Sequence, residues 1–466
     1  MPYLVALGYA GLFIMIGAFL RSKVKFFQDF LVPSSLIGGL LGFLVINFLA
    51  LPVPTMGGVE YLKTGAFGTL VFHFFAVGFV GIGLVKTVSA VGQAASTAKV
   101  VFRGTMWMAI MFTLGYAIYG LMGYSIFSAW HAIAGGDSPL IGILLGPGYA
   151  QGPGQTMAYA TIMESHGISN AVNIGMTFVA CGFFASMFIG VPLARYGLRK
   201  GWGGSGRSTE LPDYFVTGVY TKDQRGPSAT HVTYPGNIDT FALHLGLFFF
   251  VYFLAYCVGI CWARVMPAVI APLGIGFVFM WALIIAKGVR IGAGRLNVEH
   301  MLDDQTIRRF TGVCVDFMIA AVFMSIQFSA IQGMLVPIIL TVVAATLITL
   351  WFSIYFGSRT PELGLERTLC CYGTMTGTIA TGLLVLRIVD ADFKTTVAEE
   401  AGLWSFITVS SIAIPIMYIA MPLAAVPEVP LLGVSGLTLA LGIFALTIPA
   451  MLILLKVFKL WGKPQF

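Results

Sequence analysis

The stretch LLGPGYAQGPGQTMA, Leu144 to Ala158, decides the fold, because it places a helix-breaking run inside an apolar part of the chain. Its central nine residues, 146–154, hold four glycines and two prolines. Glycine favours turns, and proline removes a backbone hydrogen-bond donor and interrupts helices. A soluble protein would place such a run in a surface loop, but here apolar segments flank it on both sides. The stretch therefore predicts a turn in the protein interior.

The composition predicts an all-α membrane protein with many spans. Of the 466 residues, 58% are hydrophobic and 10% are charged, whereas soluble domains have about 25% charged residues. Apolar runs of roughly 20 residues recur, and each can cross a hydrocarbon core of roughly 30 Å. The formal charge of +7 fits basic cytoplasmic loops, so we expect no nucleic-acid partner. The six cysteines show no metal or disulfide spacing and no P-loop, HExxH or GxSxG pattern occurs, so we do not expect an enzyme.

The apolar segments divide into spans and hairpins. We expect spans near residues 3–20, 30–51, 67–85, 104–127, 170–195, 239–262, 265–286, 310–331, 334–357, 400–421 and 432–455. Two further stretches, 139–165 (the first hairpin) and 366–390 (the second hairpin), are predicted to enter and leave the membrane on one side. With that topology, 23 of the 26 Lys and Arg residues are cytoplasmic, whereas a full crossing by either hairpin would invert everything downstream. The N-terminus is then outside and the C-terminus cytoplasmic.

This topology gives the two halves of the chain the same plan in opposite orientations. Pro33 precedes Gly42-Phe43 by nine residues, and Pro267 precedes Gly276-Phe277 by nine. We therefore expect two inverted five-helix repeats, each with a re-entrant hairpin, and one extra C-terminal span. The predicted divisions are a first repeat, a cytoplasmic linker, a second repeat, and the extra span with its tail: 1–200, 201–238, 239–421 and 430–466. Inverted repeats with paired broken segments are typical of transporters.

The hairpin tips are the candidate binding site. Irregular backbone at membrane depth persists only where protein buries it or a wet cavity receives it. A helix that starts after the first tip would attract an anion, and threonine hydroxyls with tip carbonyls suit a small cation. The candidate substrate-binding residues are Gly152, Gly154, Gln155, Thr156, Asn173, Gly373, Thr374, Gly377 and Arg387. The candidate cation ligands are Thr374, Thr376, Thr378, Thr381 and Asp316. The alternative is that the small residues only allow tight helix packing.

Charged residues within apolar segments have alternative roles. Arg387 could hold a substrate carboxylate, or it could reach the cytoplasmic surface or pair with Asp390. Asp316 could bind a cation or a proton, or lie at the membrane interface. The segment from Gly294 to Phe310 is predicted to form an amphipathic helix on the cytoplasmic surface.

Several segments resemble the glutamate:sodium symporter family of bacteria. They are VPSSLIGGLLGFL (32–44), VGIGL (80–84), ESHGISNAVNIGMTFVACGFF (164–184), GVPLARYG (190–197) and CCYGTMTGTIATG (370–382). The resemblance implies two inverted repeats with hairpins that enter from opposite sides, Na+-coupled glutamate uptake, a homodimer and an elevator-like motion. The chain departs from the family at the first tip, which is less rich in glycine, at Ala380, Val385 and Arg387, and in its extra C-terminal span.

The predicted function is secondary active transport. We expect Na+, as a coupling ion, to drive glutamate or a related organic anion into the cell across a bacterial inner membrane. The expected partners are the anionic substrate, the lipid bilayer and a second copy of the chain. Proton coupling, with Asp316 as the titrating group, and a passive channel are the alternatives.

Overall fold

Most of the chain is helical in the computed structural model. The structure describes residues 2–49, 52–55, 58–61, 64–85, 95–203, 213–226, 229–266, 271–390, 394–407, 413–427, 429 and 433–466. Within these ranges seven helices are long and apolar enough to cross a membrane, which confirms the predicted class of all-α polytopic membrane protein. They cover Tyr3–Lys23, Thr64–Leu84, Ala98–Ala134, Ala171–Arg199, Thr240–Val265, Phe328–Gly357 and Gly436–Val457.

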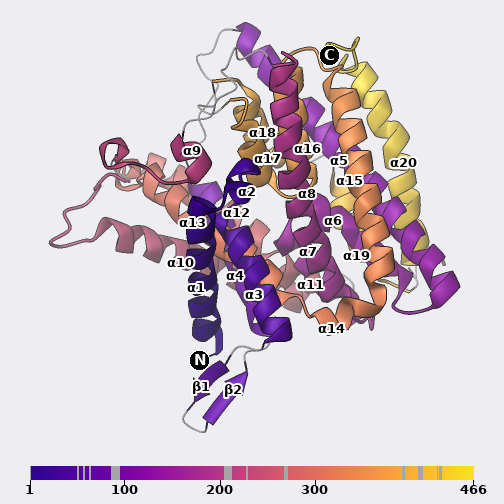
Figure 1. Ribbon diagram of the computed structural model, residues 1–466, viewed down its shortest axis with the longest axis horizontal. Helices are drawn as coiled ribbons and strands as arrows, with labels where there is room; N and C mark the ends of the chain where they lie inside the picture. The colour runs from indigo at the N-terminus through magenta and orange to yellow at the C-terminus, as the bar shows by residue number, and fades with distance from the viewer. Residues whose placement is uncertain are drawn as a thin grey trace.

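The first part of the chain consists of long helices, one small antiparallel hairpin and the first broken segment (Figure 1). In order, the elements are α1 (Pro2–Lys23), α2 (Lys25–Asp29), α3 (Ser34–Phe48), β1 (Pro52–Thr55), β2 (Gly58–Tyr61), α4 (Thr64–Leu84), α5 (Ala95–Ala134), the 3-10 helix η1 (Pro139–Leu144), α6 (Leu145–Ala150), α7 (Pro153–Ser165) and α8 (Ala171–Arg199).

The second part contains further long helices, the second broken segment and the last helix, α20. After α9 (Asp213–Thr217) and η2 (Lys222–Gln224) come α10 (Thr240–Val265), α11 (Pro272–Gly276), α12 (Val278–Arg295), η3 (Glu299–Met301), α13 (Asp304–Ser325), α14 (Phe328–Ile331), η4 (Gln332–Met334), α15 (Leu335–Gly357), α16 (Gly364–Met375), α17 (Ile379–Leu386), α18 (Val397–Ile407), the π-helical η6 (Pro415–Ala420), α19 (Met421–Ala424) and α20 (Gly436–Val457).

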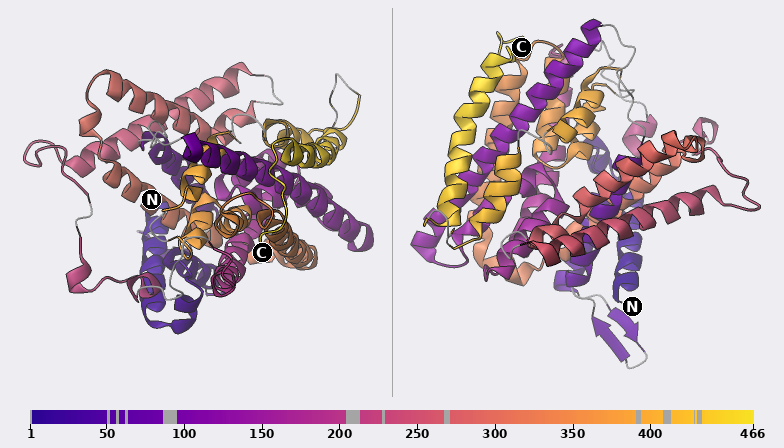
Figure 2. Two further views of the ribbon diagram at one scale, coloured as in Figure 1. Left: turned by 90° about the horizontal axis from the view of Figure 1, so that it is seen from above. Right: turned by 180° about the vertical axis from the view of Figure 1, so that it is seen from behind.

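The helices form two groups. In one group α4 packs against α13, while α3 packs on α13 and α12 packs on α4. The other group contains α5, α8, α15, α20 and both broken segments. Figures 1 and 2 show α10 and α12 at one side of the molecule and α5, α15 and α20 at the other. Helices at both sides expose apolar residues, such as Phe250 and Phe253 on α10 and Leu347 on α15, as expected for surfaces that face lipid.

The connection between α12 and α13 differs from the prediction. The continuous amphipathic helix predicted from Gly294 to Phe310 is wrong, because α12 ends at Arg295 and α13 begins at Asp304. Asn297 has a φ of 57°, a left-handed conformation that ends a helix. Asp303 then caps α13 by accepting the N–H of Thr306 at 2.8 Å. The predicted span near 265–286 also differs, since the long helix there starts only at Val278.

Asp303 ties α13 to its neighbours. Its carboxylate accepts the hydroxyl of Thr306 at 2.7 Å and the N–H of Thr230 at 3.4 Å, and its own N–H donates to Nε2 of His244 on α10 at 2.8 Å. Burial acts to raise the pKa of Asp303, but the hydrogen bonds, led by those of Thr306, outweigh it and hold the pKa below its usual value of 3.8. The carboxylate form therefore stabilises this junction.

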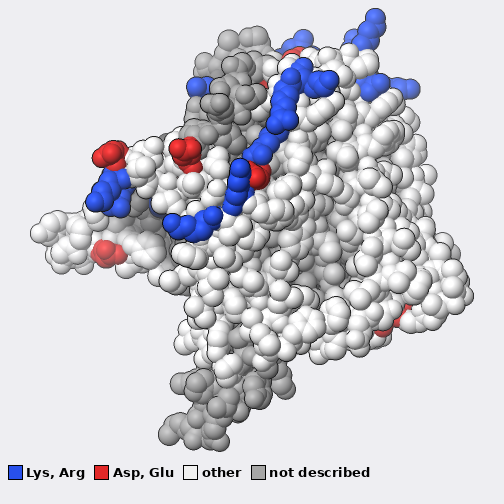
Figure 3. Space-filling view, viewed as in Figure 1, with Lys and Arg blue, Asp and Glu red and all other residues white. Residues whose placement is uncertain are grey.

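Charge and termini are distributed unevenly over the molecule. The N-terminus and the β1–β2 hairpin lie at one end, and the C-terminus lies at the other (Figure 1). On the face shown in Figure 3, the Lys and Arg side chains occupy the upper part, toward the end that carries the C-terminus.

Candidate functional site: two broken hairpins that meet

The first hairpin is broken at Gln151 and Gly152, between α6 and α7. Gly152 has φ 85° and ψ −171°, a conformation open essentially only to glycine. Pro153 follows as the first residue of α7, where its missing N–H and fixed φ suit a helix start. The carbonyl of Gly152 accepts the hydroxyl of Thr156 at 2.7 Å. The sequence GPG thus turns the chain and starts a new helix at once.

The second hairpin is broken at 376–378, between α16 and α17. The hydroxyl of Thr381 accepts the N–H of Thr378 at 2.8 Å and lies 2.7 Å from the carbonyl of Gly373. The two arms lie close together, because a Cβ on Gly373 would be only 2.9 Å from Cα of Gly382. Gly377 also lies close to Thr381, since a Cβ on Gly377 would be 2.5 Å from the hydroxyl oxygen of Thr381.

The two tips touch one another in the interior. A Cβ on Gly152 would lie 2.5 Å from Cγ2 of Thr378 and 3.7 Å from the carbonyl oxygen of Gly377. Helix α8 passes the same point, and a Cβ on Gly182 would lie 2.6 Å from the carbonyl oxygen of Thr376. All three contacts depend on a glycine. The structure thus brings together two helix breaks that are more than 200 residues apart in the sequence.

Several buried polar atoms near the tips have no hydrogen-bond partner among the residues that the structure describes. They are one amide atom of Gln151, Oε1 of Gln155 and Oγ1 of Thr374, on side chains that are 9%, 5% and 3% exposed. An unsatisfied buried group costs about 1–3 kcal/mol, so such atoms suit a bound ligand, ion or water. A cavity of about 10 Å³ lies beside Thr374 and Trp404, which is room for about one water molecule.

The predicted ligands that lie at the tips fall into two sets. Gly152, Gln155 and Thr156 belong to the first tip and are buried. Gly154 faces α4, because a Cβ there would overlap the ring of Phe75. The second tip contains the remaining glycines and the threonine ligands: Gly373, Thr374, Thr376, Gly377, Thr378 and Thr381.

Three predicted ligands lie elsewhere. Oδ1 of Asn173 accepts the N–H of Gln327 at 3.1 Å, nine residues along α8 from Gly182. Arg387 is exposed and ends α17, so it lies at the opposite end of that helix from the tip. Asp316 is exposed on α13, whose main packing partners are α4, α3 and α1.

Buried tyrosines surround the tips, and the sequence analysis did not single them out. The hydroxyl of Tyr116 donates to Oε1 of Gln151 at 3.0 Å, and that of Tyr119 donates to the carbonyl of Met375 at 3.1 Å. Tyr149 on α6 bonds Thr346 on α15 at 3.0 Å. Buried tyrosine hydroxyls generally find partners. Two tyrosines three residues apart within an apolar helix were the available signal, since they share one helix face.

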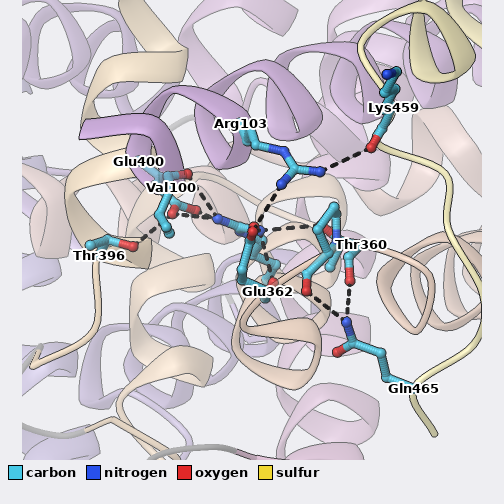
Figure 4. A network of polar contacts seen from close by, with 10 residues as sticks. Val100, Arg103, Thr360, Glu362, Thr396, Glu400, Lys459 and Gln465 are labelled. Carbon is cyan, nitrogen blue, oxygen red and sulfur yellow. Dashed lines mark hydrogen bonds and ion pairs between the residues drawn. The ribbon is translucent and has the colours of Figure 1, made fainter. Parts of the chain in front are cut away.

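A buried ion pair anchors the base of the second hairpin (Figure 4). Arg367 on α16 and Glu400 on α18 are both fully buried and form two parallel bonds of 2.8 and 2.7 Å. The other guanidinium donors reach the carbonyls of Glu362 (2.8 Å) and Val100 (3.1 Å) and the hydroxyl of Thr360 (3.3 Å). All five donors of this arginine are therefore used. The sequence analysis counted Arg367 among the cytoplasmic basic residues, but the burial of its side chain could not be predicted from the sequence.

The C-terminal tail, residues 458–466, closes over the same base. The N–H of Gln465 donates to the carbonyl of Ser358 at 2.7 Å, and its side chain donates to the carbonyl of Thr360 at 2.7 Å (Figure 4). Phe466 stacks on Trp202, which follows α8, with ring centroids 4.6 Å apart. The tail thus links the end of α8 to the α15–α16 connection.

A family model for sodium/glutamate symporters matches residues 3–360. The chain belongs to the sodium/glutamate symporter family. The match confirms the resemblance seen in the sequence, although the segment 370–382 that carried part of it lies beyond the matched range. The protein is therefore a multi-pass membrane protein in a family of transporters rather than enzymes. A search of curated proteins finds no match to this symporter.

Within the part of the symporter that the structure describes, no group of three or more His, Cys, Asp and Glu side chains is placed to hold a metal ion. The oxygen atoms gathered at the tips are instead hydroxyl, amide and backbone carbonyl groups, such as those of Thr374, Gln155 and Gly377. Neutral oxygen ligands of this kind suit hard cations.

Proposed function

We propose that the protein is a Na+-coupled symporter that moves glutamate or a related organic anion into a bacterial cell across the inner membrane. Family membership supports the coupling ion and the substrate class. The observation that carries the location of the site is the contact between the two tips, at Gly152 and Thr378, beside polar groups that the protein leaves unpaired. These are neutral groups beside the irregular backbone of the two breaks, where glycine lets a ligand approach closely.

In this proposal the first tip binds the substrate. The first turn of α7 directs its N–H groups toward the tip, and its dipole favours a carboxylate. Gln155 and Thr156 lie in the same turn, and the unpaired Oε1 of Gln155 suits an ammonium donor of the substrate. Asn173 and Arg387 remain candidates for substrate binding only in a conformation that brings them to the tips.

The second tip binds Na+. The unpaired hydroxyl oxygen of Thr374 is the primary ligand, and carbonyl oxygens of the break at 376–378 complete the coordination. The hydroxyl oxygens of Thr376, Thr378 and Thr381 are further candidates on the same tip. Asp316, which lies away from this tip, belongs to the proton-coupled alternative. Binding of the cation next to the substrate anion reduces the charge that must be buried during transport.

Transport requires two states, and the helix order supports an inverted repeat that provides them. The packing of α3 on α13 has a counterpart in the packing of α12 on α4, as expected if the halves are related by symmetry. We infer an elevator-like motion in which the group containing α5, α8, α15 and both hairpins moves against the group containing α4 and α13. The basic residues near the C-terminal end of the molecule support a cytoplasmic C-terminus and an outside N-terminus. The family resemblance supports a homodimer.

Uptake in proteoliposomes tests the proposal. An inward Na+ gradient should drive accumulation of labelled glutamate, and a Na+ ionophore should abolish it. Accumulation driven only by a pH gradient would favour the proton-coupled alternative, and equilibration without any gradient or saturation would favour a channel. If neither gradient drives glutamate, a thermal-shift screen of amino acids and dicarboxylates with and without Na+ identifies the substrate.

The cation site has its own test. Thr374→Ala should raise the Na+ concentration at half-maximal uptake by at least several-fold. Thr447→Ala is the matched control, because Thr447 lies on α20 and its hydroxyl donates within that helix to Ile443 at 2.7 Å. Equal Na+ dependence in the two variants would remove Thr374 from the site.

A further inference from the structure

We propose that Tyr116 and Tyr119, one turn apart on α5, are positioning residues that link the two hairpin tips, so that a movement of one tip is transmitted to the other. The proposal rests on the proposed function, because it assumes that the tips form the transport site. Both side chains are fully buried, and each directs its hydroxyl to a different hairpin. Neither residue contacts the substrate in this proposal.

Tyr116 holds the first tip. Its hydroxyl donates to the amide oxygen of Gln151 at 3.0 Å, directly before the turn at Gly152. The ring lies against α6, where a Cβ on Gly146 would be 3.0 Å from it. Whichever way the side-chain amide of Gln151 is oriented, Tyr116 bonds one of the two polar atoms of that amide and leaves the other for a ligand. The hydroxyl therefore fixes the direction in which that group points.

Tyr119 holds the second tip. Its hydroxyl donates to the carbonyl of Met375 at 3.1 Å, and it also bonds the hydroxyl of Thr349 on α15. Met375 is the last residue of α16, so its carbonyl is among those that a helix end leaves without an intrahelical partner. The next residues, from Thr376 on, form the break. The hydroxyl thus fixes the position at which the second tip begins.

Helix α15 completes the connection. Tyr149 lies on α6, before the turn of the first hairpin, and its hydroxyl bonds the hydroxyl of Thr346 at 3.0 Å and the carbonyl of Val342 at 3.3 Å. Thr346 and Thr349 are one turn apart, so α15 receives one tyrosine from the first hairpin and one from α5. The rings of Tyr119 and Tyr149 meet edge to face, with centroids 5.9 Å apart. Both tips are therefore fastened to the same pair of helices, each of which directly precedes one of the hairpins.

Removal of a single hydroxyl separates this role from packing. Phenylalanine keeps the ring and its burial, so Tyr116→Phe and Tyr119→Phe lose only the hydrogen bonds. Tyr252→Phe is the control: Tyr252 lies on α10, and its hydroxyl bonds Nδ1 of His73 on α4 at 2.6 Å, outside the contacts of the two tips.

Hydrogen–deuterium exchange of the full-length protein in detergent measures the link without any assumption about the substrate. Tyr119→Phe should raise exchange in peptides of the second tip and also in peptides covering 145–160, which Tyr119 does not bond. Tyr116→Phe should show the reverse cross-effect on 370–382. An increase confined to the hairpin that lost its bond, or a response equal to that of Tyr252→Phe, would overturn the proposal.

Transport gives the second readout. Tyr119→Phe should raise the Na+ concentration at half-maximal uptake, and Tyr116→Phe should raise that of the substrate, each by about 2- to 10-fold, the range expected for one neutral hydrogen bond. The double variant should depart from the product of the single effects, as interacting residues do. Additive effects would contradict the link. Absence of Na+-driven uptake in the wild type would remove the proposed function but would leave the exchange experiment valid.

Discussion

Replacing Glu400 with glutamine should strongly destabilise the protein, because it removes the buried counter-ion of a fully buried arginine and leaves only the partly exposed carboxylate of Glu362 at 3.5 Å. Glu400 accepts two bonds from Arg367 and one from the hydroxyl of Thr396 at 2.8 Å. Glutamine has nearly the same shape, but it is neutral and presents an NH₂ group to one of the guanidinium donors. Both partners are 0% exposed, so water cannot replace the lost carboxylate.

The expected cost follows from this burial. Breaking a buried ion pair by removing one partner costs about 3–5 kcal/mol, or a factor of roughly 100 to 4,000 in the equilibrium between folded and unfolded protein. Replacing both members by apolar residues of similar volume is often close to neutral. The variant Arg367→Met with Glu400→Leu should therefore be more stable than Glu400→Gln alone.

Reversible unfolding of the purified protein in mixed micelles, followed by fluorescence, measures this difference. Glu299→Gln is the internal control, because Glu299 pairs with Arg290 at 3.0 Å but is 37% exposed, where ion pairs contribute about 0–1 kcal/mol. A loss of stability in Glu400→Gln no larger than that of Glu299→Gln would refute the reasoning.

Three further outcomes are expected. Gly104→Ala places a Cβ against the carboxylate of Glu400, so it should lower the unfolding midpoint, and combining it with Glu400→Gln should add less than the sum. Gly152→Ala should abolish uptake and destabilise the protein, because the new Cβ would meet Thr378. Gly167→Ala is the control: Gly167 also has a positive φ (84°) but lies in open space, so alanine there should cost only backbone strain of about 1–3 kcal/mol. Equal effects of the two substitutions would refute the contact between the tips. Asp303→Asn should lower the stability at neutral pH, because the lowered pKa of Asp303 means that the folded state favours the carboxylate. The difference in stability from the wild type should vanish as the pH falls below 3.8. A difference that stays constant with pH would contradict the assignment.

The helix breaks could be located from the sequence because their cause is local. Glycine and proline act on their own backbone, and the structure has breaks at 151–152 and 376–378, within the two stretches that composition singled out. The partners of the tips could not be located in this way. The contact of Tyr119 with Met375 joins residues 256 apart in the sequence, and nothing near either residue specifies the other.

The error at 294–310 has a different physical origin. The mixture of polar and apolar residues there suits an amphipathic surface helix, but Asn297 adopts a left-handed conformation and Asp303 starts a new helix. Both residue types compete with helix formation by bonding nearby backbone. The roles assigned to Asn173, Arg387 and Asp316 were drawn from their chemistry within apolar segments, and the packing of α8, α17 and α13 places them away from the tips in this structure.

The ion pair of Arg367 and Glu400 constrains how the chain is made. Arg367 is synthesised 33 residues before its partner, and at about 5–20 residues per second it must wait about 2–7 s for Glu400 to appear. During that interval the cation has no carboxylate in α18 to accompany it. The second hairpin therefore gains the full set of polar contacts at Arg367 only after α18 has been made. The carbonyl of Val100, made long before, is already in place to receive it.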